Sequence, residues 1–140
     1  TGLGYREIDN MSLFQKILSR LTYEGVKIVE AAGYKECKVG DTPRWRLIRA
    51  SALLPQFLTR GIFKRNVKKM VLSSMAQDVL KNGSGQTELE DINGHLLELA
   101  KQHQVDAPYN QAIYRLCVEL FDKGQFEPMS VETVWRKMSV

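Results

Sequence analysis

Residues 12–33 read SLFQKILSRLTYEGVKIVEAAG and carry a clear helical pattern. Apolar or small residues recur there at steps of three and four, at Leu13, Phe14, Ile17, Leu18, Leu21, Gly25, Ile28, Val29 and Ala32. This spacing is typical of an amphipathic helix with one buried face. Asp9, Asn10 or Ser12 can cap its start, and Gly33 suits the left-handed position beyond its end. The stretch therefore predicts a helix over residues 12–32.

Two further helices are predicted on either side of Pro55, which breaks or restarts a helix. The first begins at Asp41-Thr42-Pro43, where either polar residue can cap and the proline fits the first turn. The second covers about residues 56–76 and is expected to be irregular around its glycine and serines. It ends before the loop Asn82-Gly83-Ser84-Gly85.

The second half of the chain predicts three more helical segments. The first starts with a capping box formed by Thr87 and Glu90. Its apolar stripe consists of Leu89, Ile92, Leu96, Leu99 and Ala100. The next begins at Pro108 and stops at Gly124, and a short last helix is capped by Ser130. No stretch alternates like a strand over six or more residues, so the fold class is all-α, with five or six helices.

The composition suits one helical domain over residues 1–140, with 44% hydrophobic and 26% charged residues. No apolar run is long enough to span a membrane and no secretory signal layout is present, so we expect a cytoplasmic protein without a membrane partner. Because the chain begins at Thr1 without an initiator Met, we expect it to be cut from something longer. Cys37 and Cys117 are expected to be reduced core thiols, and no metal site is expected near His95 or His103.

The positive charge is concentrated in one block, which favours anionic partners. Eight basic residues lie between Arg44 and Lys69, and no acidic residue occurs between Asp41 and Asp78. A nucleic-acid binder is one hypothesis for this block. However, Phe63, Val67 and Met70 interrupt the basic run at core spacing. We therefore expect no nucleic-acid partner.

Polar side chains gather between residues 73 and 94, inside an otherwise apolar helical pattern. Ser73 and Ser74 are either helix-interior or capping serines, or hydroxyl donors to a carboxylate ligand. Glu88 is either a surface carboxylate at a helix start or part of a cleft wall. A serine hydrolase is disfavoured because no G-x-S-x-G motif occurs.

The remaining polar residues of the second half have structural readings. His95 can pair with Asp91 on the surface, since the two are four residues apart. Gly94 can let another helix approach, and Gly25 weakens its helix unless another backbone packs closely there. Tyr109, Asn110 and Tyr114 are expected to pack while exposing their polar tips.

Three ordered motifs resemble the C-terminal half of ketopantoate reductases (2-dehydropantoate 2-reductases). They are Ser-Ser-Met-x-Gln-Asp at 73–78, Thr-Glu-x-x-x-Ile-Asn-Gly at 87–94 and Ala-Pro-Tyr-Asn-x-Ala-Ile-Tyr at 107–114. The resemblance covers about residues 10–121 and leaves 122–140 as an extension. It implies an all-α domain similar to the C-terminal domain of 6-phosphogluconate dehydrogenases. In such an enzyme this domain packs against an N-terminal dinucleotide-binding domain.

The resemblance also implies an activity and two site residues. The family reduces the ketone of ketopantoate to pantoate with NADPH, on the coenzyme A and pantothenate pathway. Ser74 is the implied substrate-binding residue, and Glu88 the implied residue of the cofactor and substrate cleft. No catalytic residue is assigned within the chain. The expected partners are the N-terminal domain, a 2-keto acid substrate and a second copy in a homodimer.

Two parts of such an enzyme are missing from the 140 residues. No G-x-G-x-x-G loop follows a strand, and the Lys and Asn helix of the family does not precede the matched motifs. The isolated chain is therefore expected to bind no NADP(H) and to be inactive. The alternative is a non-catalytic helical interaction module that kept the fold.

Overall fold

The computed structural model describes residues 1–3, 5–37, 42–67, 88–122 and 127–138. The helices are η1 (Tyr5–Glu7), α1 (Met11–Ala31), α2 (Trp45–Leu53), α3 (Gln56–Val67), η2 (Glu90–Gly94), α5 (His95–Gln102), α6 (Pro108–Asp122) and α7 (Val131–Met138). The described ranges contain six α-helices and no strand, which confirms the all-α prediction.

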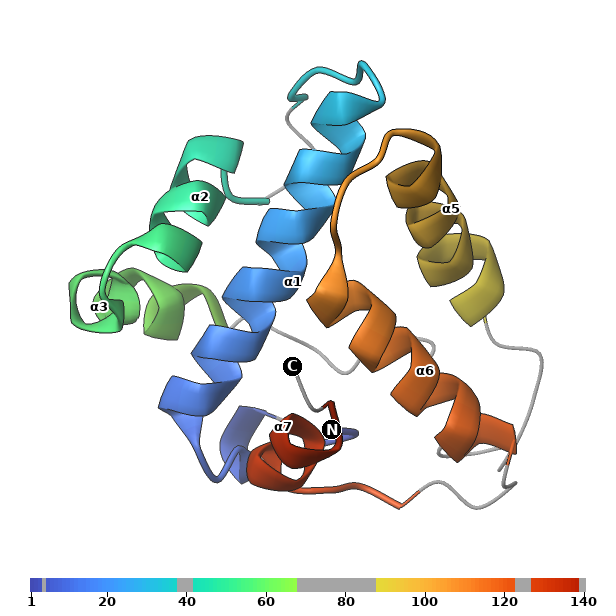
Figure 1. The fold of residues 1–140 in the computed structure, drawn as a ribbon. Coiled ribbons are helices and arrows are strands. Elements are labelled where there is room, and N and C mark those ends of the chain that lie inside the picture. Colours follow the sequence, from blue (N-terminus) through green and yellow to red (C-terminus); the bar gives the residue numbers. More distant parts are fainter. Residues whose placement is uncertain (4, 38–41, 68–87, 123–126, 139–140) are drawn as a thin grey trace.

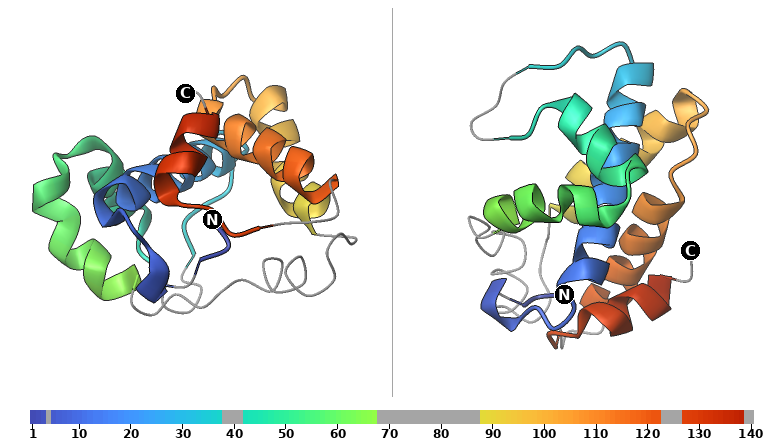
Figure 2. Two further views of the ribbon diagram at one scale, coloured as in Figure 1. Left: turned by 90° about the horizontal axis from the view of Figure 1, so that it is seen from below. Right: turned by 90° about the vertical axis from the view of Figure 1, so that its left-hand side faces the viewer.

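Helix α1 forms the centre of the molecule, and the other helices pack along its two sides (Figure 1). Helices α2 and α3 lie on one side of α1, while α5 and α6 lie on the other. Helix α7 crosses near the start of α1 and also contacts α6 (Figure 2). This arrangement separates the α2–α3 pair from the α5–α6 pair by the width of one helix.

The predicted first helix is confirmed, with Asn10 as its cap. The Oδ1 atom of Asn10 accepts a hydrogen bond from the backbone nitrogen of Leu13 at 3.0 Å. Gly33 follows the helix with a φ of +87°, as expected for a left-handed residue after a helix end. Within the described residues no backbone packs against Gly25, because a Cβ built there meets nothing within 4 Å. The close packing of another backbone against Gly25, which the sequence analysis considers, is therefore not observed there.

Two hydrophobic clusters lie along α1. The larger contains Phe14, Ile17, Val67, Ala112, Leu116, Val131, Val134 and Met138. The smaller contains Ile28, Ala100 and Ala107. Since α7 supplies three residues of the larger cluster, the segment after the family motifs is an integral part of the core. The backbone nitrogen of Val131 also donates to Asp9 Oδ1 at 3.1 Å.

The prediction for the start of α2 was wrong. The helix begins at Trp45, and Pro43 precedes it instead of occupying its first turn. The carbonyl of Arg44 accepts the first helical bonds, and no side chain of Arg44 caps the end. Instead, Glu36 Oε1 accepts the backbone N–H of Trp45 at 2.6 Å. The cap thus comes from nine residues upstream, which local cap rules do not consider.

The break at Pro55 is confirmed, because α2 ends at Leu53 and α3 begins at Gln56. The expected continuation of α3 to residue 76 and the glycine-serine loop at 82–85 lie outside the described residues. Ser130 caps α7 as predicted, with its Oγ accepting the backbone N–H of Thr133 at 3.1 Å.

Candidate functional site

Glu88 is the predicted site residue that the structure describes. It is exposed and lies in the turn before η2. Its carbonyl accepts the backbone N–H of Ile92 at 2.9 Å. Its carboxylate makes no hydrogen bond or ion pair with any other described residue, so within this part of the chain it is available to a ligand.

Ser74, the predicted substrate-binding residue, lies outside the described residues together with Ser73. Thr87, the first residue of the predicted capping box, does so as well. The relation between Ser74 and Glu88 therefore stays a prediction.

The segment after Glu88 is a π-helical turn, which the sequence reading missed. The backbone N–H of His95 donates to the carbonyl of Glu90, five residues back, as well as to that of Ile92. A π turn holds more residues than an α turn and shifts the helical register. Ile92, predicted to lie on the buried stripe, is instead 56% exposed. An α-helical period applied across the whole segment could not find this shift.

The capping box predicted for Glu90 stays a prediction, because its partner Thr87 lies outside the described residues; the Glu90 side chain contacts α6. The hydroxyl of Tyr114 donates a hydrogen bond to Glu90 Oε2. This bond, together with the neighbouring negative charge, raises the pKa of Tyr114. The same carboxylate folds over Gly94, where a Cβ would lie 2.9 Å from Oε1. Gly94 therefore makes room for the Glu90 side chain. The approach of another helix, which the sequence predicts at this glycine, is not observed among the described residues.

The predicted pair between His95 and Asp91 is replaced by another. His95 Nδ1 lies 3.7 Å from Glu98 Oε2, and both side chains are exposed.

A buried carboxylate, which the sequence reading also missed, holds the start of α6. Glu24 of α1 accepts the backbone N–H of Tyr109 at 3.0 Å and that of Asn110 at 2.8 Å. Its Oε2 also accepts Asn110 Nδ2 at 2.8 Å. Helix N-termini leave such N–H groups unpaired and favour negative charge. The available signal was Glu24 itself, an acid placed between Leu21 and Ile28 on the apolar stripe.

This contact corrects the expectation for Asn110, which is buried and exposes no polar tip. Tyr109 packs against Trp135 of α7, with ring centroids 6.1 Å apart. The start of α6 is thus fixed to α1 and α7 together, and α6 in turn carries Tyr114 toward Glu90.

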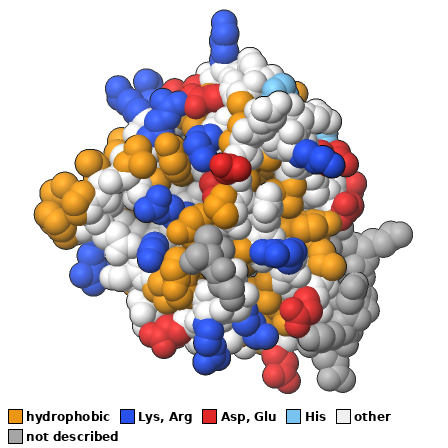
Figure 3. Space-filling model, in the orientation of Figure 1, with side chains coloured by type: hydrophobic (Ala, Val, Ile, Leu, Met, Phe, Trp, Pro, Cys, Tyr) orange, Lys and Arg blue, Asp and Glu red, His pale blue; other side chains and the backbone are white. Residues whose placement is uncertain are grey.

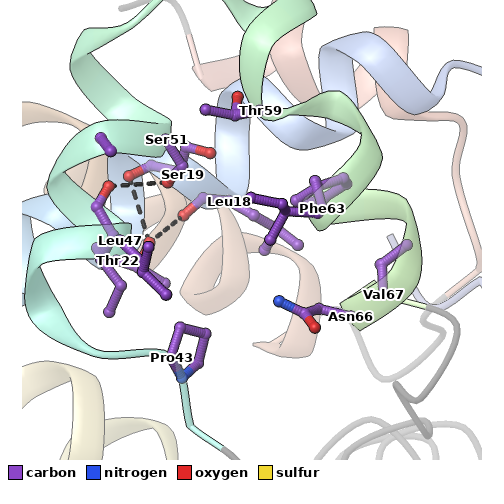
Figure 4. A pocket seen from close by; sticks show the side chains of 13 residues that line it. Leu18, Ser19, Thr22, Pro43, Leu47, Ser51, Thr59, Phe63, Asn66 and Val67 are labelled. Carbon is purple, nitrogen blue, oxygen red and sulfur yellow. Dashed lines mark hydrogen bonds between the residues drawn. The ribbon is translucent and has the colours of Figure 1, made fainter.

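An apolar pocket of about 540 Å³ lies between α1, α2 and α3 (Figure 4). Its walls include Leu18, Leu47, Ile62 and Phe63. Hydroxyl groups also line it, and those of Thr22 and Ser51 are bonded within the protein. Thr22 donates to the carbonyl of Leu18 at 2.8 Å, and Ser51 to that of Ile48 at 2.8 Å. Among the described residues that line this pocket, none has a charged side chain.

A set of exposed apolar side chains covers α2 and α3, and we call it the α2–α3 face. It consists of Leu47, Leu53, Leu54, Phe57, Leu58 and Ile62. Figure 3 shows apolar side chains gathered at this edge of the molecule, with basic side chains around them. One of the basic residues, Arg49, pairs with Glu30, and this hydrogen bond raises the pKa of Arg49. The basic block is therefore mixed with an apolar surface. The core spacing predicted for Phe63 and Val67 is confirmed, because Val67 belongs to the larger hydrophobic cluster and Phe63 packs against it, while Met70 lies outside the described residues.

Other kinds of site find little support in the described ranges. No group of three metal-ligating side chains occurs there. Both cysteines are free: Cys117 is partly buried, whereas Cys37 is exposed and is not the core thiol that was expected. No helix in the described ranges is long and apolar enough to cross a membrane.

One comparison with known proteins gives a match. The family model described as "Ketopantoate reductase PanE/ApbA C terminal" matches residues 1–120. No curated protein and no solved structure matches significantly. The family match covers most of the chain, including Glu88 and the π turn, and it ends within α6.

Proposed function

The chain belongs to the ketopantoate reductase C-terminal family, and we propose that it is the substrate-binding and dimerisation domain of an NADPH-dependent reductase of 2-keto acids. Ketopantoate is the proposed substrate and pantoate the product, which places the enzyme on the pantothenate pathway. The cytoplasm is the proposed location. Glu88 carries this proposal, because it is an exposed carboxylate in the family's Thr-Glu motif without a partner among the described residues.

The residues present do not fit a dinucleotide site. The described ranges contain no strand, and the sequence contains no glycine-rich phosphate loop of the G-x-G-x-x-G type. We therefore place NADP(H) on the N-terminal partner domain that the family implies. This chain supplies groups that hold the substrate: the carboxylate of Glu88 to accept a hydrogen bond from a substrate hydroxyl, and the hydroxyl of Ser74 to donate one.

The location of Glu88 also suggests which face meets the partner domain. Glu88 directly precedes Leu89 and η2, and η2 contacts α5 and α6, which lie on one side of α1 (Figure 1). The α2–α3 face lies on the other side of α1. A domain that closes over Glu88 thus leaves the α2–α3 face exposed, and soluble monomers rarely keep large apolar patches exposed. We propose that a second copy of the protein covers this face.

The proposal is tested in the protein extended to include its N-terminal domain. NADPH oxidation is followed with ketopantoate and with a panel of other 2-keto acids. We expect turnover that falls at least about a hundredfold in Glu88→Ala, the scale of losing a group that orients substrate. Glu98→Ala is the matched control, because Glu98 is an exposed acid on α5 that pairs only with His95 among the described residues.

Two results would contradict the proposal. If Glu88→Ala turns over as fast as the unchanged protein, Glu88 is not a site residue. If no 2-keto acid is reduced although the fold is intact, the chain is a helical interaction module, the alternative considered above. The isolated 140 residues should be inactive in the same assay.

A further inference from the structure

The π turn η2 determines the direction in which Glu88 leaves the helix. It occupies Glu90–Gly94, and only Leu89 separates it from Glu88. One extra residue in a helix rotates the preceding residues by about 100° relative to those that follow. π turns within helices are frequent at functional sites. The register of this turn is therefore a property of the candidate site.

The π turn does not bury the isoleucine that it contains. It leaves Ile92 56% exposed, whereas an uninterrupted helix would place this residue on the buried stripe. The backbone also departs from the α-helical bonding pattern, since the N–H of His95 reaches back to Glu90. Because the π turn leaves an isoleucine exposed, other contacts must stabilise the turn.

The visible contact is made by Glu90 and Tyr114. Glu90 is the first residue of the turn, and its Oε2 accepts the hydroxyl hydrogen of Tyr114 on α6. Its Oε1 lies close to the Cα of Gly94, the last residue of the turn, where a Cβ would be 2.9 Å away. The Glu90 side chain thus spans the whole turn and ties it to α6.

Helix α6, which carries Tyr114, is held in place by buried hydrogen bonds. Helix α6 is fixed to α1 through the buried Glu24, which is 4% exposed and accepts three N–H groups of Tyr109 and Asn110. Tyr114 lies just over one turn further along the same helix. A series of contacts therefore runs from the central helix through α6 to the residue that spans the π turn.

We propose that Tyr114 and Glu90 are positioning residues for Glu88: their hydrogen bond holds the π turn in the register that points Glu88 toward the substrate. This inference rests on the proposed function. In this proposal neither Tyr114 nor Glu90 touches the substrate, and both act through the backbone that carries Glu88. The proposal predicts that removing the hydrogen bond between Tyr114 and Glu90 lowers catalysis only in a protein that still has Glu88.

The test is a double-mutant cycle in the protein with its N-terminal domain. Tyr114→Phe removes the hydroxyl, and we expect kcat/KM for ketopantoate to fall about three- to tenfold, the scale of one hydrogen bond. In a Glu88→Ala background the same change should have no effect. Glu90→Ala should match Tyr114→Phe, whereas Glu90→Gln keeps an acceptor oxygen and should retain activity.

Tyr109→Phe is the matched control, because this tyrosine lies on α6 but packs against Trp135. An unimpaired Tyr114→Phe, or one that is equally harmful with and without Glu88, overturns the inference while leaving the proposed function intact. If Glu88→Ala itself is fully active, the proposed function fails and the inference fails with it.

Discussion

Glu24 Oε2 lies 2.8 Å from both the backbone nitrogen and the side-chain Nδ2 of Asn110, 86 positions further along the chain. This buried carboxylate replaces the cap that α6 lacks, since Ala107 before the helix has no side-chain acceptor. The contact fixes the start of α6 to the central helix. The position of Tyr114, and through it that of the π turn, depends on this contact.

Replacing Glu24 should destabilise the fold. Glu24→Ala removes the acceptor of two helix N–H groups and one of the two acceptors of the Asn110 amide, so we expect a loss of about 3 kcal/mol in the free energy of unfolding. Urea denaturation followed by circular dichroism measures it. Glu98→Ala, an exposed acid elsewhere, should change stability by less than about 0.5 kcal/mol. An equal, small effect of both changes would show that the Glu24 contacts contribute little.

Replacing Gly25 should have the opposite effect. A Cβ at this position meets nothing within 4 Å, and the residue lies in the interior of α1. Gly25→Ala should therefore raise the free energy of unfolding by about 0.5–1 kcal/mol, because alanine loses less backbone freedom on folding. The same denaturation experiment measures it. A loss of stability instead would mean that another group packs against Gly25 in solution.

The α2–α3 face should control association. Phe57 is 76% exposed, and Phe57→Glu places a charge where a second copy would bury an aromatic ring. Light scattering of the protein should change from dimer to monomer, with the circular dichroism spectrum unchanged. Val118→Glu, which alters an exposed apolar residue of α6, is the control and should stay dimeric. A monomer before any substitution, at high concentration, contradicts the proposed dimer.

The bond between Tyr114 and Glu90 should be visible in a pH titration. Because the pKa of Tyr114 is raised above its ordinary value of 10.0, the stabilisation is complete below about pH 10 and is lost as the pH rises through the raised pKa. Tyrosinate absorbance should show a late-titrating component that Tyr114→Phe removes.

Gly94→Ala tests the same bond without altering either partner. Its methyl group would displace the Glu90 carboxylate, so the late component should shift toward the ordinary pKa. Gly61→Ala on α3, where a Cβ meets nothing within 4 Å, is the control. An unchanged titration in Gly94→Ala would mean that Glu90 moves aside without losing Tyr114.

The two cysteines should differ in reactivity. Burial raises the pKa of Cys117, which lowers its thiolate fraction, while Cys37 is exposed. A thiol-specific reagent at mild alkaline pH should modify Cys37 quickly and Cys117 slowly until the protein is unfolded. Mass spectrometry of peptides from a time course measures both rates. Equal rates in the folded protein would contradict the burial of Cys117.

Local sequence determined most of the helices. The apolar period at 12–32 together with the Asn10 cap, the proline at 55 and the Ser130 cap each act within a few residues, and the structure confirms all three. The family motifs were equally readable, since they are short and ordered along the chain. In these cases the free energy of forming a helix depends on residues that are close in the sequence, and a sequence pattern therefore shows it.

Tertiary structure alone decided the features that place the candidate site. Glu24 and Asn110 meet because α1 and α6 pack side by side, and Glu90 spans its turn because Tyr114 lies across from it. Helical periodicity predicted a buried Ile92 and a pair between Asp91 and His95. Both predictions were wrong, and periodicity, which assumes a constant α-helical register, also gave no sign of the π turn at Glu90–Gly94. Bonds between residues far apart in the chain leave no local signal, so only the folded arrangement of the helices shows them.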